Sequence, residues 1–377
     1  MRHILMISLV LAISTPVCAN RLDPKPKMDA NEITWFGVLD NVIVTCSNAG
    51  WVQVLDYNTV RPSAMWCLDD YSYEEMLNLI LVPKGSIRLF AHVKWLGPSV
   101  LGIRFYNLDT GVPTMDRRVR GDPWLMGVVF NKEGSQLYCI GNQTIFRIDE
   151  GTSKITQLPL DKLYPLSVCW IRAFPDENVF ILCHDSHLIG KNWKGKPLWR
   201  MNFKGWGQSL DLGLVPSLPI SPNGVFLVES ENLKGPARII SVSLLDGRVL
   251  WERPISDSNG STFRAMSYDG RKQAWFEKGK LWIRSIDPNS AVEVPQIDML
   301  ADVAFVGDGS TLVSLPTLTI VAEDKTANTV TLQRKSHVLS VLDTASGKTV
   351  KTVDLDDERF KAARKDTSAA ASDANAK

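Results

Sequence analysis

Residues 338–355, VLSVLDTASGKTVKTVDL, show the pattern that decides the fold: a short apolar segment, a tight polar turn and a second short apolar segment. The pattern recurs along the chain. Its other copies are Val52–Trp66, Ile103–Arg118, Ile145–Leu158, Leu188–Met201, Ile239–Pro254 and Leu281–Ile297. The turns are centred near Asn58, Asp109, Gly151, Lys194, Asp246, Asn289 and Ala345, roughly 42–56 residues apart.

This spacing leaves room for one four-stranded antiparallel sheet per repeat, and seven such sheets can pack radially around an axis. We therefore predict an all-β protein in which residues 33–355 form a single seven-bladed β-propeller of four-stranded antiparallel blades. The strands A to D of a blade run from the axis outward. Their A–B and C–D turns share one face of the ring, and their B–C and D–A loops share the other.

The loops differ between the two faces. The A–B and C–D turns are uniformly tight, whereas the B–C loops vary: Val93–Ser99 and Glu231–Ala237 are longer, and Thr317–Ser336 predicts an extra hairpin. Variable loops on a rigid scaffold commonly carry binding residues. The B–C/D–A face is therefore the predicted functional face.

The two chain ends differ in composition from the repeats. Residues 1–19 combine a basic start, a short apolar run and small residues before a cleavage point at Ala19, which predicts a signal peptide. The Leu-small-small pattern of a lipid-attachment site is missing before Cys18. Residues 20–32 read as a polar tether, and residues 356–377 as a short helix followed by a disordered tail. We expect a monomer that is periplasmic or secreted, with no membrane span.

Charge and cysteine content restrict the function classes. The 377 residues carry a formal net charge of +1, which argues against nucleic acid as a partner. The cysteines after Cys18 are few and odd in number, which is unlike a disulfide framework. Cys169 and Cys183 flank a turn on adjacent predicted strands. They form either one disulfide or, as we favour, two buried thiols.

Histidines and carboxylates gather near the predicted functional face. His184, Asp185 and His187 form a candidate transition-metal site, and the alternative is that they are ordinary loop residues, with no cofactor bound. Other candidates on this face are Asp69, Asp70, Glu74, Glu75, His92, Glu229, Glu231, Glu277 and His337. Such carboxylates could act in acid–base chemistry or bind calcium, or they could simply be solvated.

A further cluster mixes cations with tryptophans. It consists of Lys191, Trp193, Lys194, Lys196, Trp199, Arg200, Lys204 and Trp206. Such a set can stack sugars or bases. We favour the other interpretation, in which the tryptophans pack between blades and the lysines face water.

Some hairpins also resemble known repeats. Residues 246–252 (DGRVLWE) and 195–199 (GKPLW) resemble the edge of the PQQ-like, quinoprotein-type propeller repeat, and residues 340–350 (SVLDTASGKTV) resemble the YVTN-type repeat. The resemblance covers about three of the seven hairpins and implies a fold. Quinoprotein dehydrogenases carry an adjacent cysteine pair and an eight-bladed ring, neither of which this sequence has. The resemblance therefore points toward non-catalytic relatives, such as a periplasmic scaffold of outer-membrane protein assembly.

Catalytic motifs are missing from the sequence: there is no Gly-x-Ser-x-Gly elbow, Walker loop, dinucleotide glycine fingerprint or His-Glu-x-x-His. We therefore expect a non-catalytic binding or scaffold protein that engages a protein or small-molecule partner through the B–C/D–A face. The alternative is a periplasmic enzyme, a quinoprotein-like oxidoreductase or a lactonase-like hydrolase, that uses the central channel mouth of the same face.

Overall fold

The computed structural model places the described part of the chain in β-strands and assigns no helix there. The described residues are 25–27, 29, 32–39, 41–68, 76–84, 86–97, 100–120, 125–131, 133–141, 144–152, 154–159, 168–174, 178–184, 187–202, 225–230, 237–255, 262–267, 272–277, 279–285, 291–295, 297, 301–306, 309–316, 318–324 and 329–356. The predicted signal peptide and the predicted helix and tail after Asp356 lie outside them. Within the described residues, no helix has the length and apolar character needed to cross a membrane.

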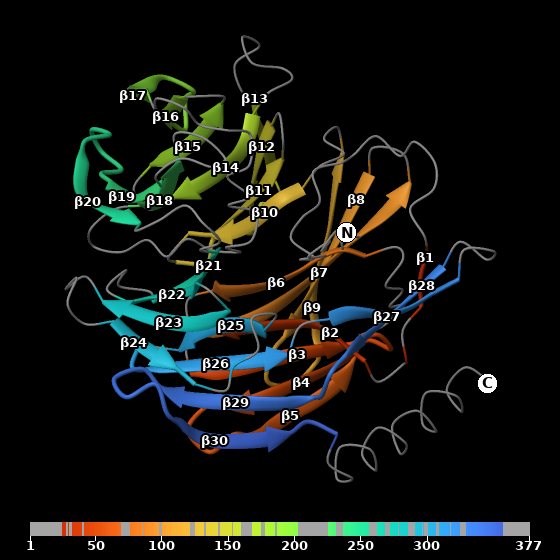
Figure 1. Ribbon diagram of the computed structural model, residues 1–377. Coiled ribbons are helices and arrows are strands. Elements are labelled where there is room, and N and C mark those ends of the chain that lie inside the picture. The colour runs from red at the N-terminus through yellow and green to blue at the C-terminus, as the bar shows by residue number, and fades with distance from the viewer. Residues whose placement is uncertain are drawn as a thin grey trace, which may run out of the picture.

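The strands pair into successive antiparallel sheets (Figure 1). The first three contain β2 (Ile33–Leu39), β3 (Val42–Ser47), β4 (Trp51–Asp56) and β5 (Arg61–Cys67); β6 (Met76–Lys84), β7 (Ile87–Gly97), β8 (Val100–Asn107) and β9 (Pro113–Arg120); and β10 (Leu125–Phe130), β11 (Gln136–Gly141), β12 (Thr144–Asp149) and β13 (Lys154–Pro159). The next two contain β14 (Val168–Phe174), β15 (Val179–His184), β16 (His187–Asn192) and β17 (Pro197–Asn202); and β18 (Val225–Ser230), β19 (Ala237–Val242) and β20 (Val249–Ile255). The last two contain β21 (Thr262–Met266), β22 (Lys272–Glu277), β23 (Lys280–Ser285) and β24 (Ala291–Val294); and β25 (Ala301–Val306), β26 (Thr311–Pro316), β29 (Val338–Asp343) and β30 (Thr349–Asp354).

All seven predicted hairpins are present, each as the last two strands of its sheet. Six of the sheets have four described strands, and the β18–β20 sheet has three. The chain that precedes β18, where its innermost strand is predicted, lies outside the described residues.

A separate sheet of three strands, here called the insert sheet, interrupts the last repeat between β26 and β29. The predicted extra hairpin is formed by β27 (Leu318–Asp324) and β28 (Thr329–Arg334). A strand from the predicted tether, β1 (Lys25–Lys27), pairs in parallel with β28. The insert sheet lies at one side of the molecule, beyond the ends of the neighbouring strands (Figure 1).

One loop prediction is wrong. Val93–Ser99 was expected as a loop, but β7 runs to Gly97 and pairs with β8 as far as Val100. The apolar residues after His92 continue the strand, and the Gly-Pro pair marks only its tight end. His92 is therefore a mid-strand residue and is 2% exposed.

The sheets follow one another around a centre, with the first strand of each sheet innermost. These strands contact each other along the series β21, β25, β2, β6, β10 and β14. Because β25 of the last sheet contacts β2 of the first, the series joins the two ends of the chain. Apolar side chains fill the space between neighbouring sheets, as where Ile33 and Leu55 meet Val313 and Leu339.

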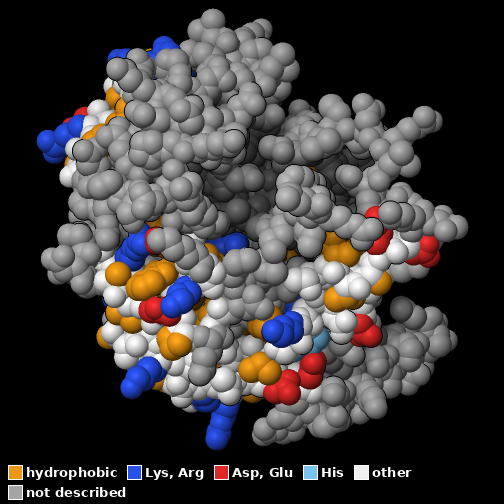
Figure 2. Space-filling model, in the orientation of Figure 1, with side chains coloured by type: hydrophobic (Ala, Val, Ile, Leu, Met, Phe, Trp, Pro, Cys, Tyr) orange, Lys and Arg blue, Asp and Glu red, His pale blue; other side chains and the backbone are white. Residues whose placement is uncertain are grey.

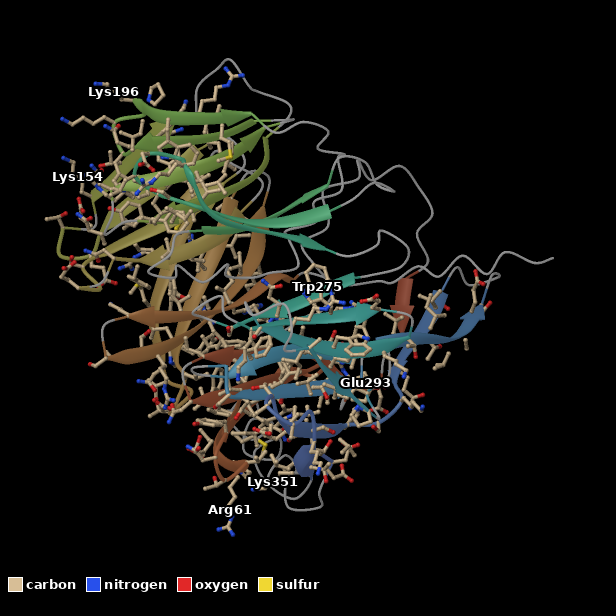
Figure 3. All side chains as sticks on the ribbon, turned by 60° about the vertical axis from the view of Figure 1, so that its left-hand side comes forward. Arg61, Lys154, Lys196, Trp275, Glu293 and Lys351 are labelled. Carbon is tan, nitrogen blue, oxygen red and sulfur yellow. The ribbon has the colours of Figure 1, made fainter. Side chains whose placement is uncertain are left out.

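Burial follows this radial order. Every residue of β3, in the middle of its sheet, is buried, because both faces of the sheet are covered by neighbours. The outermost strand β30 is exposed along most of its length. Figure 3 shows Arg61, Lys154 and Lys196 at the outside of the molecule, at or next to the start of outer strands.

Two tryptophans connect one sheet to the next in the same way. The Nε1–H of Trp66 in β5 donates to the carbonyl of Leu108, 3.1 Å away in the turn between β8 and β9. The Nε1–H of Trp199 in β17 donates to Leu244, 2.8 Å away in the turn between β19 and β20. Each ring also lies against a glycine with positive φ, Gly111 or Gly247, where a Cβ would clash. These tryptophan–glycine contacts therefore join neighbouring sheets.

Candidate functional site

Two of the predicted metal residues, His184 and His187, lie at facing ends of neighbouring strands. His184 ends β15 and His187 begins β16, and the two are paired directly across the strands. Asp185 lies outside the described residues, as do the side chains of both histidines. Within the described part of the chain, no group of three or more His, Cys, Asp or Glu could hold a metal ion.

The other candidates are separated around the ring. Glu277, at the end of β22, forms an ion pair with Arg284 of β23, and both side chains are 14% exposed. Glu229 of β18 is paired across the strands with Arg238. Asp69, Asp70, Glu74, Glu75 and Glu231 lie outside the described residues.

His337 is the candidate that the structure brings into a cluster. Its Nε2 lies 3.0 Å from Oε1 of Glu32, directly before β2. Its Nδ1 lies 2.7 Å from Oδ2 of Asp356, just after β30. The imidazole therefore bridges two carboxylates from opposite ends of the chain, at the base of the insert sheet.

Arg334, at the end of β28, extends this cluster into the ring. Its Nε–H donates to the carbonyl of Ile33 at 2.7 Å, and an Nη1–H donates to Oδ2 of Asp302 at 2.7 Å and to the carbonyl of Pro316. Its backbone N–H donates to Oε1 of Glu32 at 3.0 Å. A buried guanidinium that binds a carboxylate and carbonyls fixes the base of the insert sheet to β2 and β25.

The local electrostatics follow from these contacts. The hydrogen bond with Glu32 raises the pKa of His337, and Asp356 acts in the same direction, while burial opposes both. On the neighbouring innermost strand β21, burial lowers the pKa of Arg264, and the charge of Asp302 partly offsets that effect. Together these residues place charges of both signs close to each other in ion pairs, an arrangement that favours a structural connection.

The tryptophan and lysine cluster divides as expected at all its described members except Lys191, which is 4% exposed instead of facing water. Trp193 packs against Tyr138 with ring centroids 4.4 Å apart, and Trp199 contacts the next sheet. Lys194 and Lys196 are exposed. Lys204 and Trp206 lie outside the described residues. The packing interpretation therefore accounts for both described tryptophans.

The cysteines differ in their surroundings. Cys46 and Cys139 are buried thiols, and burial raises the pKa of Cys139 to about 12, which makes it a poor nucleophile. Cys183 is paired across the strands with Trp170, and Cys169 falls at the irregularity beside it. The side chains of Cys169 and Cys183 are not among those that the structure describes, so the choice between a disulfide and two buried thiols stays a prediction.

Carboxylates in the described turns serve local structure. In the β29–β30 turn, Oδ2 of Asp343 accepts the Ser346 backbone N–H at 2.8 Å, and Oδ1 of Asp56 accepts that of Thr59 in the β4–β5 turn at 2.8 Å. Side-chain oxygens that accept turn N–H groups are typical of Asx-turns. These residues are therefore turn formers.

Comparisons with known proteins address the fold. No protein-family model and no curated protein sequence matches this chain. Among solved structures, the computationally designed protein Ika8 matches with a TM-score of 0.51 and 15% identity, over 89% of this chain and 91% of that one. The β-propeller domain of Myceliophteria thermophila Cps50 (Swd1) matches with a TM-score of 0.50 and 11% identity, over 75% of this chain and 93% of that domain.

The chain folds as a β-propeller. The radial series of antiparallel sheets and the similarity to the Cps50 domain agree on this point. The predicted all-β class and the propeller architecture are thus confirmed. At such low identity the similarity concerns the fold alone, so the function has to be argued from the residues.

Proposed function

We propose that this chain is an exported, non-catalytic, seven-bladed β-propeller that binds a protein partner through the insert sheet on its B–C/D–A face. The single observation that carries the proposal is the insert sheet itself, which adds a surface that the ring does not need. β26 pairs directly with β29, from Thr311 opposite Asp343 to Ser314 opposite Ser340. The four-stranded sheet is therefore complete without the inserted hairpin.

The insert sheet has the surface properties of an interaction site. Within the described residues β27 is its outer strand and pairs only with β28. Ile320 and Val321 are 49% and 54% exposed, and the register shifts between Ile320 and Ala322. A bulge re-aims side chains, and exposed apolar residues on an edge strand favour contact with another chain. Figure 2 shows apolar side chains along the insert sheet and acidic ones around it.

The connections around this sheet support a binding role. On the described part of the face, Glu277, Arg334 and His337 are all engaged in ion pairs or hydrogen bonds within the protein. Such groups rigidify a scaffold. A catalytic site would need a charged group directed at a substrate instead.

The remaining parts of the proposal rest on the sequence. The innermost strand of the fifth blade is proposed within residues 203–224, because β18–β20 supply the other three strands of that sheet. Residues 1–19 have the pattern of a signal peptide, so export to the periplasm or outside the cell is part of the proposal.

Site-specific photo-cross-linking in native cells tests the proposed surface. A photoreactive amino acid replaces Val321 on the insert sheet or, as the control, Val350, which is 64% exposed beside the β29–β30 turn on the other face. We expect a discrete protein adduct from position 321 and none from position 350. Equal adducts from both positions, or none from either, would contradict partner binding through the insert sheet and favour the enzyme alternative.

A further inference from the structure

His337 occupies the junction of three segments that are distant in sequence. It lies between β28 of the insert sheet and β29 of the ring. Its two ring nitrogens contact Glu32, on the way into β2, and Asp356, on the way out of β30. A single imidazole therefore connects the N-terminal and C-terminal ends of the ring at the base of the insert sheet.

The number of protons on the ring determines how many of these contacts it can make. A carboxylate only accepts hydrogen bonds, so both nitrogens must donate if both contacts are to persist. Only the doubly protonated imidazolium has two N–H donors. Loss of one proton to solvent leaves one N–H and one lone pair, and the lone pair then faces a carboxylate.

The two carboxylates differ in how easily each can break its contact with the His337 ring. Glu32 is 2% exposed and also accepts the backbone N–H of Arg334. Separating Glu32 from His337 would therefore leave a buried carboxylate without its charged partner. The side chain of Asp356 is 37% exposed and can be rehydrated in place. The neutral ring therefore keeps its proton on Nε2, toward Glu32, and loses Asp356.

We propose that His337 is a pH-operated latch: its protonated ring ties the end of β30 to the base of the insert sheet, and its neutral ring releases Asp356. The backbone supplies a reporter, because the N–H of Leu355 donates to the carbonyl of His337 at 3.0 Å. Release of Asp356 removes the side-chain contact that holds this backbone bond in place.

The surrounding charges fit a latch centred on His337. The guanidinium of Arg334 is paired with the carboxylate of Asp302, and only its backbone N–H donates to Glu32. The carboxylate of Asp354 in β30 accepts the backbone N–H of Asp356 at 2.9 Å. Lys335, next along the chain from Arg334, is the one further cation within two residues of His337 and is exposed. Carboxylates therefore dominate next to the ring, and they favour its charged form.

The latch has a consequence for binding, and that consequence rests on the proposed function. With Asp356 engaged, the insert sheet is held at its base by both ends of the ring. With Asp356 released, the anchor through β30 is lost, while those through Glu32 and Arg334 remain. We therefore expect the partner surface to be most firmly fixed at pH values below the pKa of His337.

The test follows the His337 ring in the full chain by NMR of selectively labelled histidine, with assignment from a His337→Gln variant. The protection factor of the Leu355 amide is measured alongside, corrected for the intrinsic effect of pH. We expect the ring to titrate above the ordinary histidine value of 6.5. The protection factor should fall roughly tenfold as the ring loses its proton, the loss of a charged hydrogen bond.

Two variants separate the latch from a general charge effect. Asp356→Asn removes one carboxylate of the latch, and Asp116→Asn removes a carboxylate paired with Arg104 in the second sheet. Asp356→Asn should lower the pKa of His337 and abolish the pH-dependent step in Leu355 protection, and Asp116→Asn should change neither. Titration at or below 6.5, or equal effects of the two variants, would overturn the latch.

The link to binding is read separately, from the yield of the position-321 cross-link above and below the titration of His337. A pH-independent yield, with the NMR result as expected, would overturn only the regulation of binding. No cross-link at any pH would contradict the proposed function and leave the NMR result to decide the latch.

Discussion

Trp66 offers a sharp test of how the sheets are joined. Its side chain is 8% exposed, stacks on Tyr106 with centroids 5.2 Å apart, and donates to the buried carbonyl of Leu108. Trp66→Phe keeps an aromatic ring but removes the donor. The orphaned carbonyl should cost about 1–3 kcal/mol, and the smaller ring about 1 kcal/mol of lost burial. We expect the free energy of unfolding to fall by about 2–4 kcal/mol.

Unfolding in guanidinium chloride, followed by far-UV circular dichroism, measures this change without depending on the fluorescence of the replaced tryptophan. Val112→Ala is the matched control, because Val112 lies in the same turn as the acceptor Leu108 and is 56% exposed. The control should alter stability by no more than about 0.5 kcal/mol. Trp199→Phe should reproduce the loss in the fourth sheet. If Trp66→Phe were no worse than Val112→Ala, the tryptophan contact would not join the sheets.

Three further outcomes follow from the structure. Gly347→Ala should lower the free energy of unfolding by about 1–3 kcal/mol in a denaturant titration, because φ is +67° and a Cβ would lie 2.6 Å from a carbonyl oxygen. Gly195→Ala, where φ is +77° but the space around the residue is open, should lower it less. The pKa of His337 is raised in the folded state, so its charged ring stabilises the fold below pH 6.5, and this stabilisation is lost as the pH rises through the folded-state pKa. The loss of melting temperature caused by His337→Gln should therefore become smaller in thermal melts at increasing pH. A chelator should leave the melting temperature unchanged, as expected if His184 and His187 bind no metal; a drop that zinc reverses would contradict this.

Local patterns made the fold predictable. Each hairpin, such as Val338–Leu355, carries its own alternation and turn residues, so it can be read within one window of sequence. The inserted hairpin of Thr317–Ser336 was found for the same reason. The Val93–Ser99 loop was misread because Gly97-Pro98 resembles a loop signal, while the pairing that extends β7 comes from β8.

The cluster at the base of the insert sheet was predicted only in part. His337 was identified as a candidate, but Glu32 was assigned to a tether and Asp356 to a tail. His337 and Glu32 are 305 positions apart, and only closure of the ring brings them together. In the same way, the sequence shows Trp66 but not that its hydrogen-bond acceptor is a carbonyl in the next sheet. Contacts of this kind depend on the arrangement of whole sheets.

Circular permutation tests the central claim, that the sheets form a closed ring whose two ends meet at His337. A six-residue Gly-Ser linker, which reaches at most roughly 20 Å, would join Asp356 to Glu32. New termini would lie between Gly151 and Thr152, which are both exposed. The permutant should unfold cooperatively with a free energy within about 2 kcal/mol of the linear chain 32–356. A linear chain that folds beside a permutant that does not would mean that the ends are too far apart for a closed ring.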